Sequence, residues 1–171
     1  KQIDETQADA FLRAFVGDVP RLDDCASEAD KLSPQAFIKS HPGPYVLLDS
    51  VIMGLGKEIL FNRSALPTSC CPVWDLSGSK LCFVGRDEQC DITLQAKVVS
   101  KRHAKLKNVQ GFWSMQDLQS TNGVSLDDQR LPAGGLMPLP KRARLMVSPF
   151  ISLLFLSTDL LLDLISTYGR P

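Results

Sequence analysis

The chain has 171 residues, of which 44% are hydrophobic and 22% are charged, and its formal net charge at pH 7 is zero. This composition is typical of a globular protein with a core of useful size. Because the net charge is zero, the chain as a whole has no positive electrostatic field that would attract nucleic acid. Charge is nevertheless uneven along the sequence. Residues 1–30 contain eight acidic and three basic residues, whereas residues 97–107 contain five basic residues and no acid. The change from an acidic segment to a basic one is more informative than the net charge of the whole chain.

The five cysteines are an odd number without a C-x-x-C pair, which predicts reduced thiols and an intracellular protein. The longest apolar run, Phe150 to Ile165, is interrupted by serine, threonine and aspartate residues. It falls short of the roughly 18 uncharged residues that a spanning helix requires, so we expect no membrane contact. Because the chain opens on Lys1 without a signal-peptide pattern, we expect an excised piece of a longer protein.

An amphipathic helix is predicted for residues 4–16. Asp4 and Gln7 have the spacing of a capping box, and Gly17 supplies a stop signal. The predicted apolar face comprises Ala8, Phe11, Leu12 and Phe15. We expect this face to pack on the rest of the protein, and the alternative is that it forms a surface for dimerisation or for another protein.

Two weaker helical segments follow. One lies within residues 22–32, and a short one starts at Ser33-Pro34 and must end at the His41-Pro42-Gly43-Pro44 run. At the other end of the chain, apolar residues at helical spacing predict a last helix that Gly169 ends. Its apolar face comprises Leu161, Leu164, Ile165 and Tyr168.

From Tyr45 onward, short apolar runs separated by Gly, Pro, Asn or Asp predict β-strands. Alternation is clear where Ala104 and Leu106 are interleaved with Lys105 and Lys107, as expected for a half-buried strand. The predicted strands are 45–52, 58–61, 73–76, 80–84, 91–94, 103–109, 112–118, 124–126, 136–139, 144–147 and 150–156. So many short strands at close spacing indicate a sandwich or a barrel.

Three small groups of polar residues stand on turns between these strands. They are Gly85-Arg86, Ser100-Lys101-Arg102-His103 and Ser120-Thr121-Asn122-Gly123. A phosphate monoester offers three acceptor oxygens and is bound well by a guanidinium, an ammonium, hydroxyls and backbone amides together. Arg86, Lys101, Ser100 and Thr121 supply that set, and Asn122 can both donate to and accept from a peptide backbone. Gly123 permits a positive φ in the turn.

In this ordered combination the three groups resemble the forkhead-associated (FHA) domain, over roughly residues 72–157. The resemblance implies a mainly β fold, an eleven-stranded sandwich whose loops at one end bind phosphothreonine peptides without catalysis or a cofactor. With it we divide the chain into an N-terminal helical extension (1–44), an FHA sandwich (45–157) and a C-terminal helix (158–171). The segment 150–165 is also similar to the end of the microspherule-type FHA proteins.

The resemblance also implies a role for each site residue. Arg86 contacts the phosphate, Ser100 and Lys101 grip its oxygens, Thr121 lies against the phosphorylated residue, and Asn122 bonds the peptide main chain. Gly85, His103 and Gly123 support the site, with His103 tying its own loop to the sheet. The loop that precedes Ser100 sets the preference beyond the phosphothreonine. Here that loop consists of Lys97, Val98 and Val99.

The chain departs from the family in two places. Lys141-Arg142 stands where many relatives have Gly-Asp, which leaves the strand boundaries near 136–147 open. The first strand is also open, because residues 45–52 and 73–76 both qualify. If the earlier one is the first strand, residues 53–72 are an insertion.

Other interpretations are weaker. Taken alone, each of Arg86, Ser100 and Asn122-Gly123 would be interpreted as an ordinary surface or turn residue. The ordered occurrence of all three groups favours a phosphate-binding site instead. A Ser100, His103 and Asp117 triad lacks a G-x-S-x-G elbow. Cys70-Cys71 with His41 matches no zinc spacing, and residues 97–107 lack the aromatics of a nucleic-acid surface.

We therefore predict a phosphothreonine reader of modest affinity, on the order of micromolar. Its partner is a phosphorylated protein, so an upstream kinase is implied, and the family's usual settings suggest the nucleus or the cell cycle. No catalytic residue, metal, cofactor, small-molecule substrate or direct nucleic-acid partner is expected. The alternative is a scaffold or dimerisation module that uses the terminal helices without phosphorylation.

Overall fold

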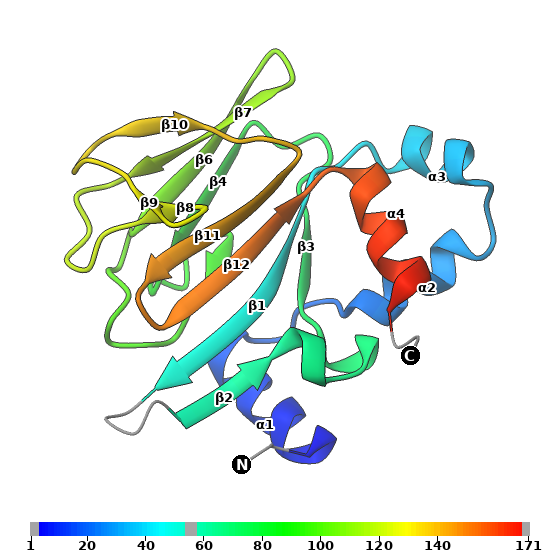
Figure 1. Cartoon of the computed structure of the whole chain (residues 1–171), viewed down its shortest axis with the longest axis horizontal. Helices are drawn as coiled ribbons and strands as arrows, with labels where there is room; N and C mark the ends of the chain where they lie inside the picture. Colours follow the sequence, from blue (N-terminus) through cyan, green and yellow to red (C-terminus); the bar gives the residue numbers. More distant parts are fainter. Residues whose placement is uncertain (1–3, 54–57, 169–171) are drawn as a thin grey trace.

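The structure is a computed structural model and describes residues 4–53 and 58–168. Two β-sheets pack face to face, and helices flank them at one side and one end (Figure 1). The fold is therefore mainly β, a sandwich with N-terminal helices and a C-terminal helix. Within the described residues, no helix is long and apolar enough to cross a membrane.

The larger sheet has seven strands in the order β2-β1-β12-β11-β8-β9, with β3 also paired to β1. Its strands are β1 (Tyr45–Met53), β2 (Glu58–Asn62), β3 (Val73–Asp75), β8 (Ser125–Leu126), β9 (Gln129–Arg130), β11 (Arg142–Ser148) and β12 (Ile151–Leu156). The central pair, β1 and β12, joins the first strand of the chain to the last. Ser50 and Ser152 share a 2.7 Å hydrogen bond across this pair.

The smaller sheet has five strands in the order β10-β7-β6-β4-β5. Its strands are β4 (Leu81–Gly85), β5 (Ile92–Thr93), β6 (Ala104–Val109), β7 (Phe112–Asp117) and β10 (Leu136–Pro138). The predicted alternation in β6 is confirmed, because Ala104 and Leu106 are fully buried while Lys107 is exposed. Each inward side chain meets the inner face of the larger sheet, which is the packing that makes a sandwich core.

The apolar run that begins at Phe150 is explained by strand β12, which is buried on both faces. Leu153 and Phe155 face the core between the sheets, whereas Leu154 and Leu156 face a second cluster that contains Leu161. A strand covered on both sides needs apolar residues at every position rather than at alternate ones. The run then continues into helix α4 (Thr158–Thr167) and ends there.

The helix predicted for residues 4–16 is confirmed as α1 (Glu5–Val16), with both hydrogen bonds of the Asp4/Gln7 capping box and its end at Gly17. Leu12 and Phe15 are buried in the core of the sandwich. The helix packs against β2 and β5, which are edge strands of the two different sheets. It therefore closes one open side of the sandwich and covers edges that would otherwise be exposed.

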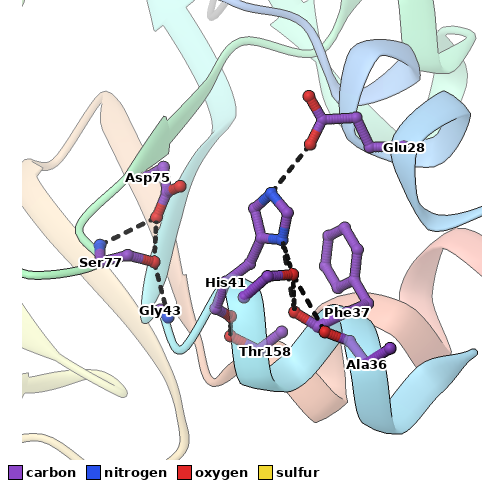
Figure 2. A network of polar contacts seen from close by, with 9 residues as sticks. Glu28, Ala36, Phe37, His41, Gly43, Asp75, Ser77 and Thr158 are labelled. Carbon is purple, nitrogen blue, oxygen red and sulfur yellow. Dashed lines mark hydrogen bonds and ion pairs between the residues drawn. The ribbon is translucent and has the colours of Figure 1, made fainter. Parts of the chain in front are cut away.

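Helices α2 (Leu22–Ala29), α3 (Pro34–Ser40) and α4 lie together beside the larger sheet (Figure 1). Figure 2 shows His41 where they meet. Its Nε2 lies 2.8 Å from Glu28 Oε2 and its ring stacks on Phe37, with 4.3 Å between the ring centroids. The Thr158 hydroxyl donates to the His41 carbonyl at 2.7 Å. One residue thus links all three helices.

The same figure shows how the link between α3 and β1 is fixed to the sandwich (Figure 2). The Gly43 N–H donates to Ser77 Oγ at 2.8 Å, and that hydroxyl donates to Asp75 at 2.6 Å. Asp75 ends β3, so this chain of bonds anchors the helical side to the edge of the larger sheet.

The structure also settles the open strand assignments. Residues 45–53 are the first strand. Both β2 and β3 pair with the same edge of it, β3 along Tyr45–Leu47 and β2 along Ser50–Met53. The described residues form twelve strands, and the one beyond the eleven predicted is β9. The excursion between β2 and β3 contains two short 3₁₀ turns, η1 (Arg63–Ala65) and η2 (Thr68–Cys70). Strand β9 was not predicted, and the expected stop at Gly169 lies outside the described residues.

All five cysteines are free thiols, and four of them are buried. Burial raises the pKa of Cys71 and of Cys82 to about 12. These thiols act as small apolar side chains in the packing and are not nucleophiles near neutral pH.

If α1 is part of the sandwich core, Leu12→Ala should lower the free energy of unfolding by about 2–5 kcal/mol, because it leaves a cavity between the two sheets. Urea unfolding followed by tryptophan fluorescence measures this. The exposed Ala14→Ser on the same helix should cost less than about 0.5 kcal/mol. Equal, small effects of the two changes would show that α1 does not contribute to the core.

Candidate functional site

The three predicted polar groups meet at one end of the sandwich, and Ser100 lies between the other two. The loop from β5 to β6 carries Ser100, whose carbonyl accepts a hydrogen bond from the Arg86 N–H at 3.0 Å. Ser100 Oγ accepts from the Thr121 N–H at 3.1 Å. The ends of β4 and β7, which are far apart in sequence, are thus joined through one serine.

Ser100 is half-buried, and its bond to Thr121 uses only acceptor capacity of the hydroxyl. The hydroxyl hydrogen therefore stays available to donate to an anion. Thr121 and Lys101 are exposed on either side of it. The arrangement places a hydroxyl donor and an ammonium on the same surface.

Arg86 follows directly on β4, and among the described residues its side chain is held at one nitrogen. Its Nε donates to the Val99 carbonyl at 3.1 Å, which directs the guanidinium along the Ser100 loop. Among residues 4–53 and 58–168, no carboxylate lies within ion-pair distance of Arg86 or Lys101. The two terminal nitrogens of Arg86 form a fork suited to two oxygens of one anion.

Asn122 is exposed and bridges to the loop that precedes Ser100. Its Nδ2 donates to the Val98 carbonyl at 2.7 Å. The amide keeps its carbonyl oxygen and a second N–H for a ligand. In the same loop Lys97 is exposed, Val98 is half-buried, and Val99 is buried in the core. Of the three candidate specificity residues, Lys97 and Val98 thus reach the surface.

His103 is fully buried and joins two of the loops. Its Nδ1 accepts from the Ser100 N–H at 3.0 Å, so the proton of the neutral ring is on Nε2, which donates to the Gly123 carbonyl at 2.8 Å. Burial lowers the pKa of His103, partly offset by its bond to Gly123 and by the charge of Asp117. Both ring nitrogens bond backbone groups, so the ring cannot serve as a general base for the Ser100 hydroxyl.

Two glycines are required by geometry. A Cβ on Gly85 would overlap the carbonyl oxygen of Lys101, which already accepts bonds from the Asp87 N–H and the Cys90 thiol. Gly123 has a φ of +78°, a conformation that disfavours other residues. Glycine at both positions lets the loops approach one another closely.

Two further residues that were not predicted support the site. Asp117 is buried and accepts from both the N–H and the hydroxyl of Ser120, at 3.0 and 2.7 Å, which shapes the turn that carries Thr121. Gln95 donates its N–H to the Phe15 carbonyl at 2.9 Å and its side-chain amide to the Arg86 carbonyl at 3.3 Å. The role of Asp117 has a signal in the sequence, because Asp117 and Ser120 have the D-x-x-S spacing of such a turn. The role of Gln95 depends on its contact with α1, for which the sequence has no local signal.

In the part of the chain that the structure describes, no three His, Cys, Asp or Glu side chains gather where they could hold a metal ion. What the three loops present instead is a set of hydrogen-bond donors and positive charges at one surface. The chemistry that this surface suits is the binding of an anion attached to an extended chain.

Comparison with known proteins identifies the segment that carries these loops. Residues 82–147 match the model of the FHA domain. The FHA domain of an Arabidopsis thaliana hypothetical protein is 21% identical over 67% of this chain and 86% of its own, with a TM-score of 0.50. No curated protein matches the chain significantly.

Two other solved structures are similar. The N-terminal FHA domain of Saccharomyces cerevisiae Rad53p, in complex with a phosphothreonine peptide, is 23% identical over 52% of this chain and 86% of its own, with a TM-score of 0.48. The FHA domain of the CT664 protein from Chlamydia trachomatis is 19% identical over 67% of this chain and 97% of its own, with a TM-score of 0.47.

Gly85→Ala should destabilise the protein by more than about 2 kcal/mol, because its methyl group would push the Lys101 carbonyl out of place. Gly78→Ala is the matched control, since Gly78 has open space around it and a φ of +75°, so only backbone strain of about 1–2 kcal/mol applies. Thermal or urea unfolding measures both. A smaller cost at Gly85 than at Gly78 would contradict the close approach.

The protein should become less stable as the pH is lowered, because His103 is buried as the neutral ring. Its pKa is lower in the folded protein than the ordinary value of about 6.5 in the unfolded chain. Below about pH 6.5 the unfolded chain therefore binds a proton that the folded protein does not, and the free energy of unfolding decreases. Urea titrations at pH 7.5 and 5.5 test this. His103→Gln should show a smaller decline between the two, and an equal decline would refute the assignment.

Proposed function

Because the chain contains an FHA domain at residues 82–147, we propose that it binds a phosphothreonine-containing segment of another protein and thereby recruits that protein. The observation that carries the proposal is the meeting of three loops at Ser100, where hydroxyl, ammonium and guanidinium donors lie on one surface. These donors match the three acceptor oxygens of a phosphate dianion.

Each site residue has a distinct role in this proposal. Arg86 contacts the phosphate with its terminal nitrogens, and the Ser100 hydroxyl and Lys101 also bind phosphate oxygens. Thr121 lies against the phosphorylated residue. Asn122 bonds the peptide main chain with its free carbonyl oxygen and second N–H, which fixes the register of the peptide.

The supporting residues hold this surface ready. His103 sets the distance between the Ser100 loop and Gly123, and Gly85 lets the Lys101 carbonyl lie directly on β4. We propose that the binding unit is the whole sandwich, residues 45–157, with residues 1–44 and 158–171 as flanking helical segments. Binding then requires no catalysis and no cofactor.

The ligand class sets the biological frame of the proposal. A phosphothreonine arises from a protein kinase, so recruitment would follow a phosphorylation event inside the cell. We propose nuclear or cell-cycle signalling as the setting, and a phosphorylated protein, rather than a small molecule or a nucleic acid, as the partner.

A scaffold that acts through the terminal helices has less support. The apolar face of α1 is buried in the sandwich core, and Leu161 of α4 is buried in the second cluster. These buried side chains are thus not available to another protein. A partner captured equally well before and after phosphatase treatment would favour the scaffold.

Arg86→Ala and Ser100→Ala should each weaken binding of a phosphothreonine peptide at least about tenfold, since each removes a charge-assisted hydrogen bond. An oriented phosphothreonine peptide library supplies the ligand, and calorimetry measures its affinity. Arg102→Ala is the control, because Arg102 is in the same loop but lies over the Phe83 ring, 5.1 Å from its centroid.

Folding of each variant is checked by its melting temperature. Undiminished affinity in a folded Arg86→Ala or Ser100→Ala protein would sink the proposal. So would equal affinity of the wild-type protein for the peptide without its phosphate.

A further inference from the structure

Arg130 is a positive charge at the site that the family resemblance did not assign. It ends β9, which pairs with β8 directly after the Asn122 loop, and its side chain is exposed. A Cβ built on Gly123 would lie 2.6 Å from Arg130 Nη2 and 2.9 Å from its Cζ. The guanidinium therefore rests on the space that the missing side chain of Gly123 leaves, next to Asn122.

A second basic residue, Lys97, belongs to the loop that Asn122 contacts. The 2.7 Å bond from Asn122 Nδ2 to the Val98 carbonyl brings the loop that contains Lys97 against the asparagine. Lys97 is exposed and adjoins Val98 in the chain. The residue proposed to hold the peptide main chain therefore has a basic residue in the loop that it contacts and another against its neighbour Gly123.

No carboxylate of the described residues is paired with Arg130. Asp127, in the turn before β9, accepts from the Arg144 N–H at 2.8 Å. Asp87 accepts from the Gln89 N–H at 3.0 Å, on the Arg86 side of the site. Asp127 and Asp128 are exposed in the turn before β9, but among the described residues neither lies within ion-pair distance of Arg130, so the guanidinium donors stay available to a ligand.

We propose that Arg130 binds the carboxylate of an aspartate or glutamate in the bound peptide, in the part that passes Asn122, and makes the site select acidic phosphothreonine segments. This inference rests on the proposed function. A guanidinium presents a planar pair of donors that fits a carboxylate, and Arg130 offers it beside the groups that fix the peptide's register. Gly123 serves two purposes, since its φ forms the turn and its bare Cα seats the arginine.

A purely structural role for Arg130 makes a different prediction. If the guanidinium only covers the Gly123 backbone, replacing it changes the melting temperature or weakens all peptides by one factor. If it binds a ligand carboxylate, replacement changes the ratio between acidic and neutral peptides. That ratio is therefore the quantity to measure.

The test uses phosphothreonine peptides with alanine at the flanking positions and a single glutamate placed in turn at each of the three residues before and after the phosphothreonine. Fluorescence anisotropy gives the affinity of each peptide for the full chain. For the wild-type protein we expect at least one position at which glutamate tightens binding by about threefold to tenfold over alanine.

In Arg130→Gln that gain should fall below about twofold, and Arg130→Lys should restore part of it because the charge returns without the fork. Arg102→Gln, which removes another exposed charge, from the Ser100 loop, should retain the gain. An unchanged glutamate-to-alanine ratio in Arg130→Gln, or no gain at any position in the wild-type protein, would overturn the inference.

The two proposals fail in different ways. If the alanine-flanked phosphopeptide binds and its unphosphorylated form does not, the proposed function holds whatever the glutamate scan shows. If neither form binds, the proposed function fails, and the role of Arg130 fails with it.

Discussion

The buried imidazole of His103 is the interaction on which the site depends. It accepts from Ser100 and donates to Gly123, so one neutral ring sets the distance between two loops that come from different strands. Backbone groups would otherwise have to be satisfied by water in a space that excludes it. Further bonds to the Ser100 loop come from Arg86, Thr121 and Asn122. They do not involve the ring, but they can form only at the distance between the loops that the ring sets. Because these bonds join parts of the protein to one another, little ordering of the loops should be required when a ligand binds.

The N-terminal helix belongs to the same construction. By closing the sandwich between β2 and β5, α1 brings the Phe15 carbonyl to Gln95, and Gln95 in turn bonds the carbonyl of Arg86. The proposed phosphate-binding surface is thus supported by a segment that lies outside residues 82–147. On the other side of the larger sheet, His41 and Thr158 join the remaining helices to one another. Helix α1 is consequently a part of the scaffold that holds the loops in place.

The sequence predicted features that have a local physical signature. The capping box of Asp4 and Gln7 and the alternation in β6 depend on neighbours in the chain, and both are present. Strand β9 was missed because both of its residues, Gln129 and Arg130, are exposed and leave no apolar pattern. The place of Arg130 beside Gly123 and the link from Gln95 to α1 are long-range contacts, which periodicity and spacing do not encode. The site residues could be named from an ordered motif, but their mutual bonds required the fold.

The pairing of β1 with β12 has a consequence for how the protein is made. These two strands form the centre of the larger sheet, and the hydrogen-bonded Ser50 and Ser152 are 102 residues apart in the chain. During synthesis on the ribosome, β1 emerges early and has no central partner until the last strand has left the exit tunnel. Loop closure over such a span is slow, and an unpaired apolar strand is prone to aggregate while it waits. Helix α1 emerges before β1 and is therefore available to shield the apolar surface of the nascent chain.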